Sequence, residues 1–179
     1  MIVYQANKAE FLLDFNDRDI EDVIHARYQA KTSRKVAPAE IRSWRESLGY
    51  VARVLSDPAI ADDVGVAIEF FLPQTAKRID VILAGHADDD SRRLIVVELK
   101  QWSSVDATDR DAIVLLRGGS RPDQVRIHPS YQAWSYTAFL EGFNEAVYDG
   151  GLQLRPCAYL HNYAAVSYTH LTLPTNREV

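Results

Sequence analysis

At residues 78–83 the chain reads Arg-Ile-Asp-Val-Ile-Leu, and at residues 94–100 it reads Leu-Ile-Val-Val-Glu-Leu-Lys. Runs this rich in Val, Ile and Leu are typical of buried strands. Asp80, Glu98 and Lys100 place charge inside these two runs. Because charged side chains are costly to bury and are rarely kept in a core without a reason, the pattern indicates a functional site.

Alternation along a strand predicts which side chains share a face. Asp80 should project together with Arg78 and Ile82, and Glu98 together with Lys100. The opposite faces would then be wholly apolar, formed by Ile79, Val81 and Leu83 on the first strand and by Ile95, Val97 and Leu99 on the second.

A hairpin symmetric about Asp89 would bring Asp80 directly opposite Glu98 on one face. Facing carboxylates repel unless a positive group joins them. A hard divalent cation such as Mg²⁺ takes carboxylate oxygens and often completes its shell with substrate phosphates. Lys100 would then stabilise charge on a phosphoryl group or help to orient an attacking water. The alternative is a salt-bridge cluster in which Arg78 and Lys100 neutralise the two acids. If the two acids point to opposite faces, the site interpretation fails.

Composition predicts one folded domain with a hydrophobic core, since the 179 residues are 47% apolar and 25% charged. The lone Cys157 excludes an intrachain disulfide framework, and the N-terminal sequence lacks the pattern of a signal peptide. No apolar run approaches the roughly 20 residues that span a bilayer. We therefore expect a soluble, cytoplasmic protein with no membrane partner. The net charge of −5 argues against coating of nucleic acid by bulk electrostatics.

The C-terminal stretch from Val166 onward can be back-translated, residue by residue, into a transposon-based sequencing adapter. We therefore interpret residues 166–179 as an artefact and residues 1–165 as a domain truncated at its C-terminus. The alternative is a genuine C-terminus with little structure.

Glu40 borders the apolar stripe of the helix expected at residues 38–55, whereas Glu46 lies nearly opposite that stripe. Glu40 is thus the better candidate for a further acid at the site, and the alternative is an ordinary glutamate favoured by the helix dipole. Residues 106–126 give no clear pattern around a loop at 117–122. Elsewhere the patterns predict helices at residues 8–15, 19–31, 38–55 and 129–148, and strands at 65–72, 78–84, 94–100 and 154–160.

The run Gln132-Ala-Trp-Ser-Tyr136 follows on the last predicted helix, and residues four apart there share a face. With Ile79-Asp80 on one strand and Glu98-Leu99-Lys100 on the next, the chain resembles the restriction-endonuclease-like phosphodiesterases of the PD-(D/E)xK type, and their RecB-type branch more closely. The resemblance implies an α/β fold, with a restriction-endonuclease-like mixed sheet containing a three-strand meander flanked by helices, plus N-terminal helices.

The resemblance also implies roles for these residues. Asp80 and Glu98 would bind Mg²⁺ or Mn²⁺ with help from the carbonyl of Leu99, and Lys100 would be catalytic together with the two acids. Glu40 is the candidate for a further metal ligand. The residues expected to contact nucleic acid are Gln132, Tyr136, Arg78 and Gln101. Two features depart from the family pattern, since Ile79 replaces its proline and the upstream helix lacks a histidine ligand, for which His25 lies too early.

The chain is similar, too, to the N-terminal segment of bacterial proteins in which such a domain precedes a P-loop ATPase of the Schlafen-like DNA/RNA helicase type. No Gly-x-x-x-x-Gly-Lys-Ser/Thr motif occurs in this sequence, so that ATPase partner would lie beyond the truncation. The expected function is metal-dependent hydrolysis of DNA or RNA. The alternative is a catalytically silent, nuclease-like module that binds nucleic acid or docks onto the ATPase.

Overall fold

The computed structural model describes residues 1–33, 35–148 and 151–163 of the chain. The expected adapter-derived segment, residues 166–179, lies outside the described residues. The fold is mixed α/β, with a five-stranded sheet and a separate three-stranded sheet. In chain order the elements are β1 (Ile2–Asn7), α1 (Lys8–Asp17), α2 (Ile20–Thr32), α3 (Pro38–Leu55), β2 (Gly65–Phe71), β3 (Arg78–His86), β4 (Arg92–Lys100), β5 (Val105–Ala107), β6 (Ile113–Leu116), β7 (Gln124–Ile127), α4 (Pro129–Phe143), α5 (Glu145–Tyr148) and β8 (Gln153–Leu160).

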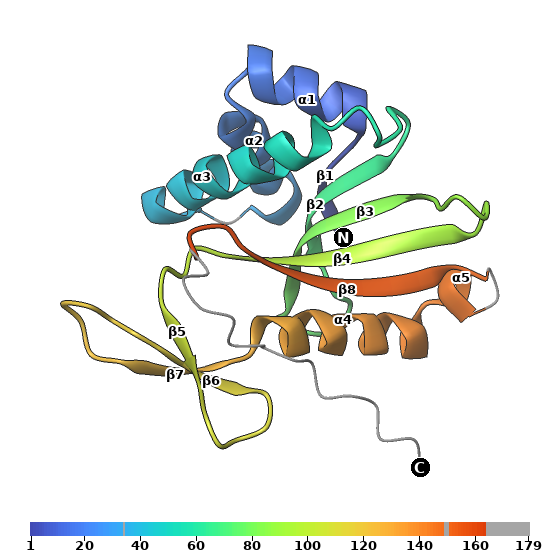
Figure 1. Ribbon diagram of the computed structural model, residues 1–179. Coiled ribbons are helices and arrows are strands. Elements are labelled where there is room, and N and C mark those ends of the chain that lie inside the picture. Colours follow the sequence, from blue (N-terminus) through green and yellow to red (C-terminus); the bar gives the residue numbers. More distant parts are fainter. Residues whose placement is uncertain (34, 149–150, 164–179) are drawn as a thin grey trace.

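The large sheet has the strand order β1-β2-β3-β4-β8. Strands β1 to β4 pair antiparallel, and β8 pairs parallel with β4 after the chain has passed through α4. The predicted meander of β2, β3 and β4 is therefore confirmed. The small antiparallel sheet β5-β6-β7 lies between β4 and α4 in the chain, at the end of the large sheet where β4 stops and α4 starts (Figure 1).

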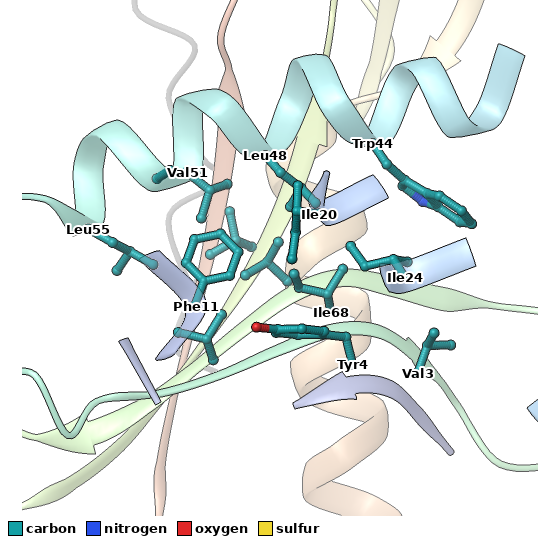
Figure 2. Close-up of a cluster of buried hydrophobic side chains, with 14 of the residues drawn as sticks. Val3, Tyr4, Phe11, Ile20, Ile24, Trp44, Leu48, Val51, Leu55 and Ile68 are labelled. Carbon is teal, nitrogen blue, oxygen red and sulfur yellow. The ribbon is translucent and has the colours of Figure 1, made fainter. Parts of the chain in front are cut away.

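Helices cover both faces of the large sheet (Figure 1). Helices α1, α2 and α3 pack on one face, where Phe11, Ile24 and Leu48 meet strand residues such as Tyr4 and Ile68 in the larger core (Figure 2). Helix α4 packs on the other face in a second core, which joins Tyr136 and Leu140 to Ile79, Ile82 and Val96. Below, these faces are called the α3 face and the α4 face.

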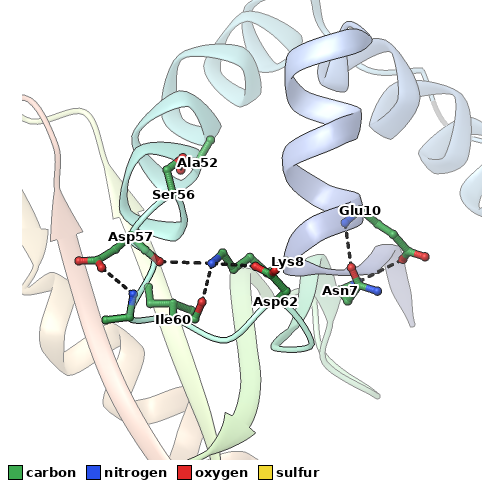
Figure 3. Close-up of polar contacts among 9 residues, drawn as sticks. Asn7, Lys8, Glu10, Ala52, Ser56, Asp57, Ile60 and Asp62 are labelled. Carbon is green, nitrogen blue, oxygen red and sulfur yellow. Dashed lines mark hydrogen bonds and ion pairs between the residues drawn. The ribbon is translucent and has the colours of Figure 1, made fainter.

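The start of α1 shows how local sequence sets an element boundary. Asn7 caps the helix, because its side chain accepts from the Glu10 N–H at 2.8 Å while the Glu10 carboxylate accepts from the Asn7 N–H. The next residue, Lys8, is buried, and its amine donates to the Asp57 carbonyl at 3.2 Å and to the Ile60 carbonyl, with Asp62 3.1 Å away (Figure 3). This lysine therefore ties α1 to the loop between α3 and β2.

Several expectations need correction. Strand β1 was not anticipated, although its Val3 and Tyr4 are fully buried. The helix expected over residues 129–148 is divided, since α4 ends at Phe143 and the short α5 begins at Glu145. Residues 106–126, which gave no clear pattern, form nearly all of the small sheet, which runs from Val105 to Ile127. Across the described residues, no helix is both long and apolar enough to span a bilayer.

Candidate functional site

The register of the β3–β4 hairpin agrees with the sequence expectation. Val81 pairs with Val97 and His86 with Arg92, so the pairing is symmetric about Asp89. One step beyond Val81 and Val97, the same register would place Asp80 opposite Glu98. The paired residues end at Val81 and Val97, so the direct cross-strand pairing of the two acids stays a prediction.

The expected alternation of side chains along β3 is wrong around Asp80. Arg78 contacts Glu40 of α3, whereas Ile82 lies in the core beneath α4, so these two do not share a face. Likewise Ile79 belongs to the α4 face and Val81 to the α3 face. The alternation of β3 thus changes phase at Asp80.

The physical reason lies on the neighbouring strand β2. Ile68 pairs with Val81 and Phe70 with Ile79, which leaves Glu69 opposite Asp80. Glu69 has a φ of 58°, in the left-handed region that a residue inside a regular strand does not adopt. This residue interrupts the pleat of β2, and β3 changes phase at the residue facing it.

The Asp80 carboxylate lies between strands rather than out from a face. Its Oδ2 accepts a hydrogen bond of 2.8 Å from the backbone N–H of Leu99. Because backbone N–H groups of a strand point along the sheet toward the neighbouring strand, this oxygen occupies the gap between β3 and β4. Asp80 also lines a cavity on the α3 face, whereas Val96 lies in the core under α4 and Val97 in the core under α3, so alternation along β4 assigns Glu98 to the α4 face. The Asp80 charge nevertheless acts on Glu98, and a shared face for the two acids stays a prediction.

Glu98 is 2% exposed, and its side chain forms an ion pair with Lys100. Its second oxygen, Oε2, is buried without a hydrogen-bond partner among the described residues. The ammonium of Lys100 also lies 5.8 Å from the centroid of the Trp102 ring. The salt-bridge alternative thus holds for Lys100 and Glu98, but one carboxylate oxygen remains unsatisfied, which is costly in a buried place.

Arg78 pairs with acids other than the two predicted ones. Its Nη1 donates to Glu40 at 2.7 Å, and its Nε forms an ion pair with Glu69. The Trp44 indole N–H donates to the same Glu69 carboxylate at 2.7 Å. Together with Asp80, these side chains line a cavity of about 110 Å³ on the α3 face.

Charge is crowded at this place, where four carboxylates (Glu40, Glu69, Asp80 and Glu98) meet the two cations Arg78 and Lys100. The pKa of Glu98 rises from 4.5 to about 7, first because of burial and then because of the Asp80 charge, against the opposing effect of Lys100. Burial also raises the pKa of Asp80, although the Leu99 hydrogen bond and Lys100 lower it. Burial raises the pKa of Glu69 to about 7 against the effects of Arg78 and Trp44. Such shifts are typical of functional sites.

The residues expected to contact nucleic acid are distributed around these acids. Gln132 donates to the Tyr136 hydroxyl at 2.7 Å, so the two share a face of α4 as predicted. Burial is the main cause of the raised pKa of Tyr136, and the negative charges of Glu98 and Asp80 raise it further. The Tyr136 hydroxyl therefore lies close enough to both acids to interact with them electrostatically. Gln101 instead binds α3, where its amide donates to Glu46 at 3.1 Å and to Ser47 at 3.3 Å.

Within the described ranges, no cluster of three or more His, Cys, Asp or Glu side chains is arranged to hold a metal ion. Mg²⁺ is often bound by only one or two carboxylates, with waters and substrate phosphates completing the shell. Asp80 and Glu98 fit that mode, because they form a charged pair across two strands and Glu98 Oε2 has no partner among the described residues. Glu40 already pairs with Arg78, and its role as a ligand stays a prediction.

Sequence reasoning missed Glu69. The signal was present, since Glu69 is the single charge in the apolar run Val66-Ala-Ile-Glu-Phe-Phe-Leu72, and it is 3% exposed. The same rule that selected Asp80 and Glu98 would have selected it. Its partner Trp44 is buried in the larger core on the α3 face.

The chain matches no family model, and neither a curated protein nor a solved structure gives a significant match.

Proposed function

We propose that this chain is a metal-dependent phosphodiesterase domain that hydrolyses DNA or RNA, of the PD-(D/E)xK type that the sequence resembles. The observation that carries the proposal is the buried Glu98 carboxylate, whose pKa the charge of Asp80 raises and whose Oε2 atom has no partner among the described residues. Lys100 forms an ion pair with only one of the two acids, so a further positive charge is needed to balance both carboxylates.

The general architecture supports the same proposal. A helix, a three-strand meander, the small sheet, a second helix and a strand parallel to β4 follow one another, and this order is compatible with the mixed sheet that the resemblance implies. Asp80 and Glu98 would hold Mg²⁺ or Mn²⁺ with help from the Leu99 carbonyl, and Glu40 is a further candidate ligand. The ion, when bound, would polarise a scissile phosphate and lower the pKa of a water.

The protein's own residues then have distinct tasks. Lys100 lies beside Glu98, and its ammonium would stabilise negative charge developing on the phosphoryl oxygens. The backbone N–H of Leu99 holds the Asp80 carboxylate in one orientation. Gln132 and Tyr136, joined by their hydrogen bond, would contact the nucleic acid from α4. In the full protein, the domain would be linked to a C-terminal P-loop ATPase of the helicase type.

The test is cleavage of labelled DNA and RNA by the purified chain with Mg²⁺ or Mn²⁺ and with EDTA. We expect metal-dependent cleavage, and a fall of at least about 100-fold in Asp80→Asn and in Lys100→Ala, because each removes a charge from the reacting centre. Asp17→Asn, on the exposed side of α1, is the matched control and should cleave normally.

Nucleic-acid binding without metal-dependent cleavage would overturn the enzyme proposal. That result would favour the silent nuclease-like module instead. Circular dichroism of each variant shows whether the fold is retained, so a lost activity can be assigned to the site.

A further inference from the structure

A second cavity, of about 230 Å³, lies where β4 ends. It opens between residues 101–103 and the turn that joins β6 to β7, and Gln101, Trp102, Arg121 and Gln124 are among its lining residues. Trp102 connects this cavity to the candidate site, because the Lys100 ammonium lies 5.8 Å from the centroid of its ring. Whatever enters the cavity is therefore next to Lys100.

The turn that closes the cavity has a defined shape. Arg117 donates to Asp106 at 2.6 Å and to Asp123 at 2.5 Å, and the Gly118 N–H donates to Asp123 at 3.1 Å. A Cβ atom on Gly118 would lie only 2.1 Å from the Arg121 carbonyl oxygen, so no other residue fits there without movement of the turn. A wall held in this way reduces the ordering cost of binding a ligand.

The lining combines a flat aromatic face with polar edges. Trp102 offers the indole ring, while the amides of Gln101 and Gln124 offer hydrogen-bond donors and acceptors. Arg121 has no ion-pair partner within the described part of the chain, and a guanidinium can stack on a ring or bind a phosphate. The volume is below the roughly 300 Å³ at which sites for drug-sized ligands begin, so the cavity suits a single flat ring system.

We propose that this cavity binds an unpaired nucleobase adjacent to the scissile phosphodiester, so that the substrate is single-stranded nucleic acid. The inference rests on the proposed function, because Lys100 and Glu98 define where the phosphate would lie. In a duplex, a base is stacked and paired and would have to be flipped out before it could enter such a cavity. In a single strand, the same base is free to stack on the indole of Trp102.

The experiment measures binding of a labelled oligothymidylate, a single-stranded RNA of the same length and a blunt DNA duplex, all in EDTA so that no cleavage occurs. We expect tighter binding of the single strands than of the duplex. Trp102→Ala should weaken single-strand binding by at least about tenfold, the typical effect of losing one stacked base. Trp102→Phe should restore most of it. Trp134→Ala is the matched control and should bind normally, because this exposed tryptophan pairs with Tyr131 on α4.

Arg121→Gln keeps the test valid if Trp102→Ala does not fold, since Arg121 is exposed and its substitution leaves the turn's hydrogen bonds intact. Equal affinity for duplex and single strands, together with normal binding by Arg121→Gln and by a folded Trp102→Ala, would overturn the inference. The two proposals fail separately. If these variants lose binding in a protein that does not cleave, the base-binding cavity is supported and the nuclease proposal is rejected. If the protein cleaves duplex in preference to single strands and Trp102→Ala has no effect, the nuclease proposal is supported and the base-binding cavity is rejected.

Discussion

Two buried charged groups of this molecule differ in how the chain satisfies them. Lys8 is 4% exposed, and its amine has two backbone carbonyls and the Asp62 carboxylate as partners (Figure 3). The charge of this lysine is therefore balanced by groups close to it. Glu98 is equally buried, yet one of its oxygens has no partner among the described residues and its nearest acidic neighbour is Asp80. The first arrangement joins two segments of the fold, and the second leaves room for a ligand.

The largest effect should follow from breaking the satisfied cluster. Lys8→Ala would leave the Asp57 and Ile60 carbonyls without their donor, and the free energy of unfolding should fall by about 3 kcal/mol. Urea denaturation followed by circular dichroism measures this change. Lys31→Ala, which removes an exposed lysine that also donates to backbone carbonyls, is the control and should cost less. An unchanged midpoint for Lys8→Ala would mean that this cluster does not hold the loop.

Glu98→Gln should change the free energy of unfolding little and abolish activity. The amide keeps the size of the side chain and removes the negative charge of a carboxyl group whose pKa burial raises to about 7. Because the fold does not favour that charge, the free energy of unfolding at pH 8 should stay within about 1 kcal/mol of the original value. Metal-dependent cleavage should nevertheless disappear. A strongly destabilised Glu98→Gln would show that the carboxylate supports the fold in the way that Lys8 does, and the contrast between the two clusters would be lost.

A further effect concerns the pH dependence of stability. Glu69 has a folded pKa of about 7 against an ordinary value of 4.5, so the folded protein holds this proton more tightly than the unfolded chain. Its contribution to stability is therefore complete below pH 4.5 and declines as the pH rises toward 7. Glu69→Gln should flatten the stability profile over this interval, measured by urea denaturation at several pH values. A profile with the same slope in both proteins would place the titration on another group.

The hairpin that carries Asp80 and Glu98 was predictable because its determinants are local. Apolar strands, a short connection and the facing acids set the register about Asp89 without reference to the rest of the chain. The joint position of Gln132 and Tyr136 followed from helix geometry in the same way. These predictions needed only the spacing of residues within one element or hairpin.

Other features depended on long-range contacts and could not be predicted. The change of phase at Asp80 is coupled to the left-handed backbone of Glu69 on another strand, and nothing in the β3 sequence signals it. The pairing of Arg78 with Glu40 rather than with Asp80 requires α3 to pack over the sheet. The cavity beside Trp102 arises from the small sheet, whose strands of three or four residues are too short to give a clear period.

The parallel pairing of β4 with β8 has a consequence for how the molecule assembles. Asp80 reaches Leu99 across only 19 residues of chain, whereas Glu98 is paired with Ala158, which lies beyond the small sheet and α4. Because contacts between distant residues carry a larger loop-closure cost, we expect the hairpin to form early during folding and β8 to dock late. Until β8 docks, β4 is an open sheet edge that carries Glu98, with Asp80 on the adjacent β3, and a nascent chain would expose its charged centre before the walls around it exist.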